Sequence, residues 1–192
     1  MKKVLIVCGY RGIPNGGWLP WLMKELEKDF VYASTVPLKN TREPVISEWV
    51  EDISQSIGKH TEEIYLVGHS LGSSGIFYYL KSLEEGQKVA GVVLVSGPIS
   101  PIDTNNPESI FRKIDDFLTP DLDFALVKNK AEKFIVVHGE KDNIVPISHA
   151  EKISSDLGCE LVVVKGGDHF TQVAEPRTYE LPSVLEALKR MF

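Results

Sequence analysis

One serine stands in a sequence context that could make it a nucleophile. Ser70 is the centre of the pentapeptide GHSLG (68–72), a G-x-S-x-G motif that directly follows the apolar run 64–68. In such a motif the serine sits on a sharp turn between a strand and a helix, with its hydroxyl exposed. The same glycines would also suit a mere strand-to-helix turn. A serine hydroxyl is a weak nucleophile at neutral pH, so the catalytic interpretation requires a general base and an acid that orients it.

An acid and a base occur downstream in the required order. Asp142 lies in VVHGEKDNIVP, just after the apolar run 134–139, and His169 lies in VVVKGGDHF, just after the run 160–166. Serine, acid and histidine therefore each follow a strand-like run. Their order along the chain is that of hydrolases whose triad lies at the carboxyl ends of parallel strands. We assign Ser70 as nucleophile, Asp142 as acid and His169 as base.

Two other carboxylates compete with Asp142 for the role of acid. Glu140 lies nearer the end of its strand and is the main alternative. Asp168 adjoins His169, and its side chain is expected to project elsewhere, because adjacent side chains point in different directions. We favour Asp142.

The other histidines are weaker candidates for the base. His138 is expected to end a strand as a hydrogen-bonded structural histidine. His69 is adjacent to the nucleophile and is expected to pack beside it, so we place it among the substrate-binding candidates. No role is assigned to His60 or His149.

Attack on an acyl carbonyl creates an oxyanion that needs preplaced N–H donors. One donor is expected to be the amide of Leu71, directly after the nucleophile. The second is expected in the loop CGYRGIPNGGW (8–18) after the first core strand, with the amide of Tyr10 favoured and that of Arg11 as the alternative. The glycines of this loop fit neither common phosphate-binding spacing, so nucleotide binding is not expected.

Two tryptophans, Trp18 and Trp21, follow this loop. They could pack the start of a helix on the sheet, or they could form an apolar wall for a substrate, and we retain both interpretations. The histidines and cysteines show no closely spaced ligand pairs, so neither a metal nor another cofactor is expected.

Apolar runs and amphipathic segments alternate along the whole chain. This alternation predicts an α/β fold with a doubly wound, mostly parallel sheet of six strands flanked by helices. The strands are expected at 3–8, 29–35, 64–68, 89–96, 134–139 and 160–166, and the helices at 18–28, 44–57, 71–85, 146–157 and 181–191. We expect one domain over 1–192, with room for two short helices and a small cap in the segment 97–131.

Composition narrows the classes of partner. The net charge is −6, and the chain has no long run of lysine or arginine, so binding to nucleic acid or to a membrane surface is not expected. Only two cysteines occur, Cys8 and Cys159, both in apolar runs typical of buried reduced thiols. The N-terminal apolar run is too short for a signal peptide, so we expect a cytoplasmic protein.

With GHSLG, HGEKDNIVP and GGDHF taken together, the chain resembles the α/β-hydrolase superfamily over nearly its whole length. More narrowly, its opening VLIVCGYRGIPNGGWLPWL and the segment 122–146 resemble the compact serine hydrolases of the YdeN and retinoblastoma-binding-protein type. The resemblance implies a minimal α/β-hydrolase fold without a large lid, and the same roles for Ser70, Asp142 and His169. The sequence departs from many hydrolases by having Cys8 before Gly9 where they have histidine, which leaves the second oxyanion donor open.

These observations lead to one main hypothesis and two alternatives. The chain is expected to hydrolyse carboxylic esters, or thioesters, of small or short-acyl molecules through an acyl-enzyme. The same triad could instead serve a peptidase or amidase. A largely non-catalytic protein-binding module on the same fold is the other alternative, and the sequence identifies no protein partner.

Overall fold

The six predicted strands form one parallel sheet. The computed structural model describes residues 2–59, 63–102, 108–118, 122–171 and 177–192. The strand order is β2-β1-β3-β4-β5-β6, and every neighbouring pair is parallel. The strands are β1 (Lys3–Val7), β2 (Tyr32–Thr35), β3 (Ile64–His69), β4 (Gly91–Val95), β5 (Phe134–Gly139) and β6 (Glu160–Val164).

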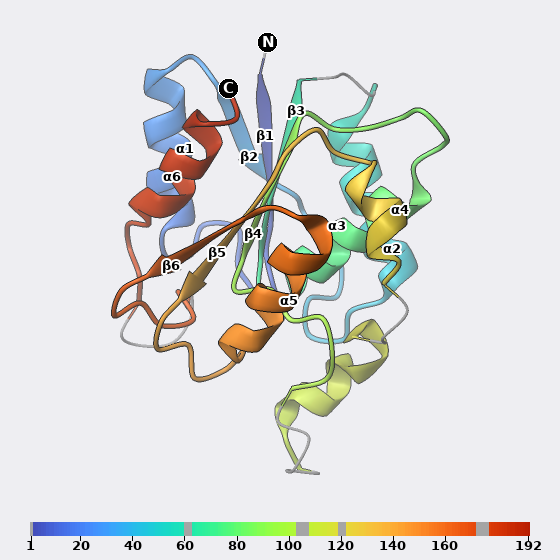
Figure 1. Ribbon diagram of the computed structural model, residues 1–192, viewed down its shortest axis with the longest axis vertical. Helices are drawn as coiled ribbons and strands as arrows, with labels where there is room; N and C mark the ends of the chain where they lie inside the picture. The colour runs from blue at the N-terminus through green and yellow to red at the C-terminus, as the bar shows by residue number, and fades with distance from the viewer. Residues whose placement is uncertain (1, 60–62, 103–107, 119–121, 172–176) are drawn as a thin grey trace.

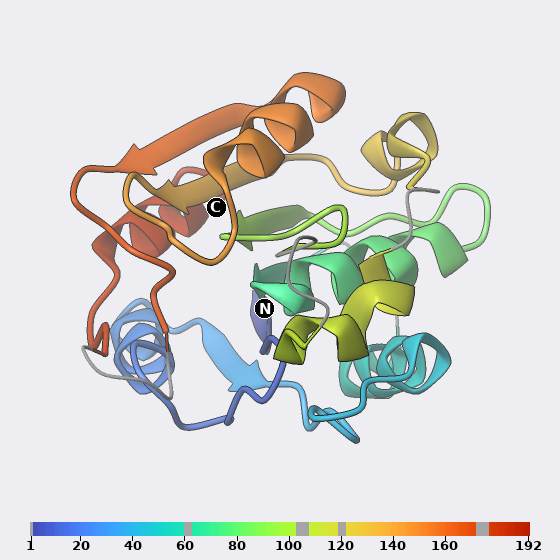
Figure 2. The same cartoon turned by 90° about the horizontal axis from the view of Figure 1, so that it is seen from below.

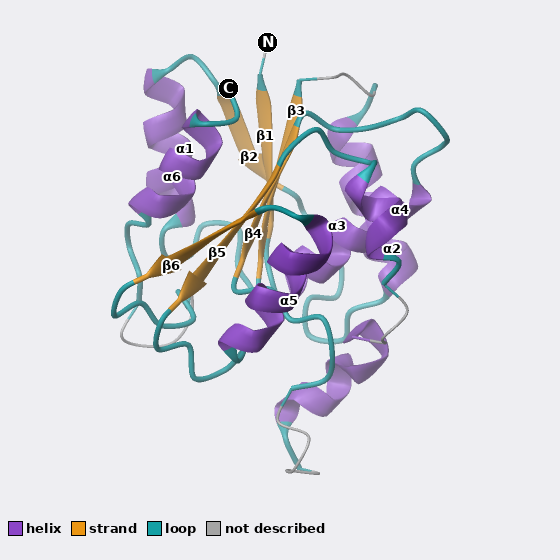
Figure 3. Ribbon diagram, viewed as in Figure 1, coloured by secondary structure: helices purple, strands orange, loops and turns teal. Residues whose placement is uncertain are grey.

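Helices cover both faces of the sheet, which confirms the doubly wound architecture (Figures 1 and 3). One face carries α1 (Leu19–Lys28) and α6 (Pro182–Lys189); the other carries α2 (Ile46–Ile57), α3 (Leu71–Ser82), α4 (Phe124–Lys128) and α5 (Ile147–Leu157). The central strands β3, β4 and β5 are buried along their whole length, because helices cover them on both sides. None of the helices in the described ranges is long and apolar enough to cross a bilayer.

The direction in which successive strands are added to the sheet reverses at β1. The chain moves from β1 outward to β2, then returns to place β3 on the other side of β1. Ligands in open α/β sheets bind beyond the carboxyl ends of the strands at such a switch point. This location is where the loop after β1 and the turn after β3 meet, and Ser70 lies on that turn.

The segment between β4 and β5 contains a 3₁₀ helix, η1 (Ile110–Leu118), followed by α4. Figure 2, which looks at the molecule from the carboxyl ends of the strands, shows η1 beside the start of α3. Ile114, Phe117 and Leu118 of η1 pack with Trp49 of α2 and Leu71 of α3. The segment expected as a cap thus lies at the switch point, although its residues 103–107 and 119–121 are outside the described ranges.

The first turn of α3 approaches the end of β1 so closely that position 72 requires glycine. A β-carbon on Gly72 would collide with the carbonyl oxygen of Val7 and lie 2.8 Å from that of Cys8. Gly75, one turn later in the same helix, is less confined, since the nearest atom to a β-carbon there would be Cε3 of Trp49 at 3.1 Å.

We therefore predict that Gly72→Ala lowers the free energy of unfolding by about 2 kcal/mol or more, because backbone atoms must move to admit the methyl group. Gly75→Ala is the matched control and is expected to be nearly neutral, since alanine favours the helix and only a side chain must shift. Urea denaturation of both variants and the parent measures the difference. Equal stability of the two variants would contradict the close approach.

Candidate active site

Ser70 occupies a strained turn between β3 and α3. Its backbone has φ 53° and ψ −127°, a conformation that residues other than glycine rarely adopt. The amide of Ser70 donates to the carbonyl of Val95 at the end of β4, at 2.8 Å, which fixes the turn to the sheet. Gly68 permits the turn, because a β-carbon there would lie 2.7 Å from Cα of Ser73. The predicted nucleophile elbow is therefore present.

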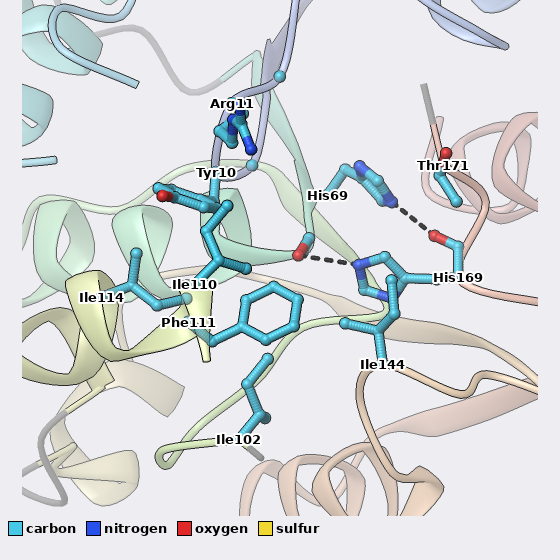
Figure 4. A pocket seen from close by; sticks show the side chains of 13 residues that line it. Tyr10, Arg11, His69, Ile102, Ile110, Phe111, Ile114, Ile144, His169 and Thr171 are labelled. Atoms are coloured by element: carbon cyan, nitrogen blue, oxygen red, sulfur yellow. Dashed lines mark hydrogen bonds between the residues drawn. The ribbon is translucent and has the colours of Figure 1, made fainter. Parts of the chain in front are cut away.

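The three residues assigned from the sequence meet in a hydrogen-bonded line (Figure 4 shows His169). The Nδ1–H of His169 donates to Oδ2 of Asp142 at 2.8 Å. This proton leaves Nε2 as an acceptor for the Ser70 hydroxyl, which lies 3.0 Å away. The arrangement is that of a nucleophile, a general base and an acid that orients the base.

Asp142 is held by its own turn. Its Oδ1 accepts from the amides of Ile144 and Val145 at 3.0 and 2.9 Å, and its side chain is 1% exposed. Burial by itself would raise the pKa of Asp142. The hydrogen bond and charge of His169, with the two amides, outweigh burial and hold this pKa below its usual value. Asp142 therefore stays a carboxylate beside the base.

The competing carboxylates are engaged elsewhere. Oε2 of Glu140 accepts from the amide of Gly166 at 2.8 Å, and Oδ1 of Asp168 accepts from the amide of Phe170 at 2.7 Å. The structure thus brings Asp142 to His169 and directs the two alternatives to backbone groups.

The other described histidines have structural partners. His138 ends β5, is fully buried, and donates from Nε2 to the carbonyl of Val145 at 3.0 Å, which supports the Asp142 turn. Nδ1 of His149 accepts from the amide of Ile99 at 3.1 Å. Burial lowers the pKa of both histidines, so both are neutral donors or acceptors. His60 lies outside the described residues.

The loop after β1 lies directly against the nucleophile. A β-carbon on Gly9 would be 2.8 Å from Cβ of Ser70 and 3.3 Å from the amide nitrogen of Leu71. The amide of Arg11 donates to the carbonyl of Thr41 at 2.8 Å, so it is already engaged. Of the two alternatives, this geometry favours the amide of Tyr10 as the second oxyanion donor, with Leu71 as the first.

Two ring N–H groups hold the loop that carries the base. Nε2 of His69 donates to the carbonyl of His169 at 2.9 Å, and Nε1 of Trp18 donates to the carbonyl of Phe170 at 3.2 Å. The rings of Trp18 and His69 also pack edge to face, with centroids 5.8 Å apart. Trp18, at the end of the loop after β1, and His69, next to the nucleophile, thus fix two consecutive carbonyls of the loop that carries His169. Sequence reasoning did not find this arrangement, because residues 18, 69 and 169 are joined only by the fold.

A cavity of about 210 Å³ opens onto Ser70 and His169 (Figure 4). Its apolar side consists of Ile102, Ile110, Phe111 and Ile114 from the segment after β4, together with Ile144. Sequence reasoning did not name these residues, although the apolar spacing within 110–118 was a usable signal for a buried helix face. Tyr10, Arg11 and His69 also line the cavity, and the placement of His69 fits its expected position beside the nucleophile.

The two tryptophans considered as a substrate wall lie in or against the core. Neither Trp18 nor Trp21 lines this cavity among the residues the structure describes. Trp18 is fully buried in the core between α1, α6 and the sheet, and Trp21 packs against the same cluster. Their positions therefore fit helix packing, and this cavity gives no support to the interpretation as a substrate wall.

Comparison with known proteins agrees with this geometry. A family model described as serine hydrolase matches residues 4–190. The chain is also 30% identical over 193 residues to YdeN of Bacillus subtilis (strain 168), a match that covers 100% of this chain and 96% of YdeN. The chain belongs to the serine hydrolase family. The crystal structure of the Bacillus subtilis ydeN gene product superposes on this hydrolase with a TM-score of 0.90, covering 100% of this chain and 99% of the other.

More distant structures share the fold. One chain from the structural work on the metagenome-derived lipolytic enzymes LipS and LipT matches with a TM-score of 0.74 at 16% identity, covering 98% of this chain and 92% of that chain. Est1E from Butyrivibrio proteoclasticus matches with a TM-score of 0.71 at 15% identity, covering 99% of this chain and 87% of its own. These matches confirm that the serine hydrolase has the α/β-hydrolase fold.

The burial of His69 predicts how stability depends on pH. Burial, assisted by the charge of nearby His169, lowers the pKa of His69 to about 3, whereas an unfolded histidine has a pKa of about 6.5. As the pH falls below about 6.5, the unfolded chain takes up a proton that folded His69 does not, so the folded state loses stability. His69→Gln removes this difference while keeping an N–H donor.

We expect the loss of unfolding free energy between pH 7.5 and pH 5 to be about 2 kcal/mol smaller in His69→Gln than in the parent. Urea denaturation at the two pH values measures each loss within one protein, so any constant effect of the substitution cancels. An equal loss in the two proteins would show that His69 takes up its proton normally in the folded state.

Proposed function

We propose that this serine hydrolase cleaves carboxylic esters, or thioesters, of small or short-acyl substrates through an acyl-enzyme. The observation that carries the proposal is the line from Asp142 through His169 to Ser70, which ends in a mainly apolar cavity. An acyl group needs an apolar space beside the nucleophile, and this cavity supplies one. The likeness in fold to enzymes described as lipolytic gives further support.

The geometry suggests the following sequence of steps. His169 Nε2 takes the proton from Ser70 as Oγ bonds to the substrate's carbonyl carbon, and Asp142 stabilises the resulting imidazolium. The amides of Leu71 and Tyr10 stabilise the negative charge on the carbonyl oxygen. His169 then gives its proton to the leaving alcohol or thiol as the bond to the acyl carbon breaks. Water gives a proton to His169 as it attacks the acyl carbon, and His169 returns that proton to Oγ of Ser70 as the acyl–oxygen bond breaks and the acid leaves.

The size of the cavity supports a short acyl group. Its volume of about 210 Å³ is below the roughly 300–1,000 Å³ that is typical of small-molecule pockets. The wall formed by Ile110, Phe111 and Ile114 closes the side toward α3. A long acyl chain would have to leave the cavity and lie in water, where its additional methylene groups contribute little to binding.

We predict that 4-nitrophenyl esters with acyl chains of two to six carbons are hydrolysed faster, in kcat/KM, than those of ten or twelve carbons. Ser70→Ala is expected to lower kcat by at least about a thousandfold and Asp142→Asn by about a hundredfold or more. Ser54→Ala, an exposed serine on α2, is the matched control and is expected to match the parent.

Three outcomes would contradict the proposal. The first is turnover that survives in Ser70→Ala. The second is a preference for the longest esters. The third is faster cleavage of the corresponding 4-nitroanilides than of the esters, which would identify an amidase.

A further inference from the structure

Among the described residues that line the cavity beside Ser70, one carries a permanent charge. Five of its lining residues are isoleucine or phenylalanine, and His69 is held neutral by burial. Arg11 is the residue with a guanidinium among those that line it. The whole chain carries a net charge of −6, so its overall field repels anions, and a local cation at the cavity stands out against that background.

Arg11 lies at the rim, on the loop after β1 that packs against Ser70. It lines the cavity and is at the same time exposed to solvent. Figure 4 shows it next to Tyr10, the residue favoured above as oxyanion donor. An anion bound by Arg11 would therefore lie close to the reacting carbonyl.

The backbone of Arg11 is fixed in an unfavourable conformation. Its φ is 56°, in the left-handed region where glycine is the default residue, and glycines stand nearby at 9 and 12. The amide of Arg11 donates to the carbonyl of Thr41 at 2.8 Å, and the amide of Gly12 donates to that of Gly9 at 2.9 Å. A long cationic side chain is thus present where the backbone favours glycine, and strain of this kind occurs often at ligand-binding sites.

The guanidinium of Arg11 has no hydrogen bond or ion pair with any residue in the described part of the chain. Arg112 and Arg190, by contrast, bind the carboxylates of Asp115 and Glu160 at 2.9 and 2.8 Å. Asp142, the acid of the catalytic line, is buried and engaged with His169. The donors of Arg11 are therefore available to a ligand.

We propose that Arg11 forms an anion subsite at the mouth of the cavity, and that the substrate is an ester carrying a carboxylate near the scissile bond. A guanidinium matches a carboxylate through two parallel N–H donors. A single cation neutralises a carboxylate monoanion, whereas a phosphate dianion would need additional donors. The inference rests on the proposed esterase function and narrows its substrate class.

The test compares anionic esters with neutral esters of similar shape. On the acyl side, the mono-4-nitrophenyl ester of adipic acid is paired with 4-nitrophenyl hexanoate. On the leaving-group side, 4-acetoxybenzoate is paired with 4-methylphenyl acetate. The readout is the ratio of kcat/KM within each pair, compared between the parent, Arg11→Gln and Arg11→Lys, so that differences in intrinsic reactivity cancel.

We expect Arg11→Gln to lower the anionic-to-neutral ratio by roughly five- to tenfold in at least one pair, mainly through KM, and Arg11→Lys to lower it less. Lys24→Gln, which removes an exposed charge on α1, is the matched control and should leave both ratios unchanged. The parent's ratio should also fall as salt rises from 50 to 500 mM, because salt screens an exposed ion pair. The affected pair identifies the side of the ester that bears the carboxylate.

Two results would overturn the subsite. If neutral esters are hydrolysed but both ratios are the same in the parent, Arg11→Gln and Arg11→Lys, the esterase function stands and the anion subsite does not. If Lys24→Gln lowers the ratios as much as Arg11→Gln does, the effect reflects net charge instead of a site. Thermal melting of each variant establishes that the compared proteins are folded. An absence of turnover with all four esters would instead refute the esterase proposal, and the subsite with it.

Discussion

The active site depends on how closely the first turn of α3 lies against the end of β1. That contact exists because Gly72 leaves room for the carbonyl of Val7. It places the loop after β1 within van der Waals distance of Ser70, so the amides of Tyr10 and Leu71 can serve one oxygen atom. Ser70 precedes this helix turn in a strained backbone conformation, and its hydroxyl lies 3.0 Å from Nε2 of His169. The positions of the proposed nucleophile and of its proposed oxyanion donors thus depend on one close approach.

The histidines around this contact have separate tasks. His169 lies within hydrogen-bond distance of Ser70, while His69 and His138 donate to carbonyls of the loops that carry His169 and Asp142. Burial lowers the pKa of both supporting histidines, so neither adds a positive charge beside the His169 ring. Asp142 therefore acts on the His169 ring without competition from a neighbouring cation, and its two amide donors keep it in place.

Residues that act next to a strand end were predictable from the sequence, because a parallel sheet brings all carboxyl ends to one edge. Ser70, Asp142 and His169 each follow an apolar run, and the six strands followed from the same runs. The burial of each strand did not, because the apolar run at 160–166 forms the partly exposed edge strand β6. The function of Trp18 was not predictable in the same way. Its ring lies in the core, and only its N–H reaches the base loop, a contact set by the packing of α1 and α6. The cavity wall formed by Ile102, Ile110, Phe111 and Ile114 likewise depends on tertiary packing, including that of η1 against α3.

The central claim is that Ser70 is activated by His169 and Asp142. The most direct measurement is the reaction of the folded protein with a fluorophosphonate, followed by mass spectrometry of its peptides. The account predicts one adduct, on Ser70, which forms rapidly in the parent and is lost in His169→Ala even though the serine remains. An adduct that forms equally fast without His169, an adduct on a different serine such as Ser73, or no adduct in the folded parent would contradict it.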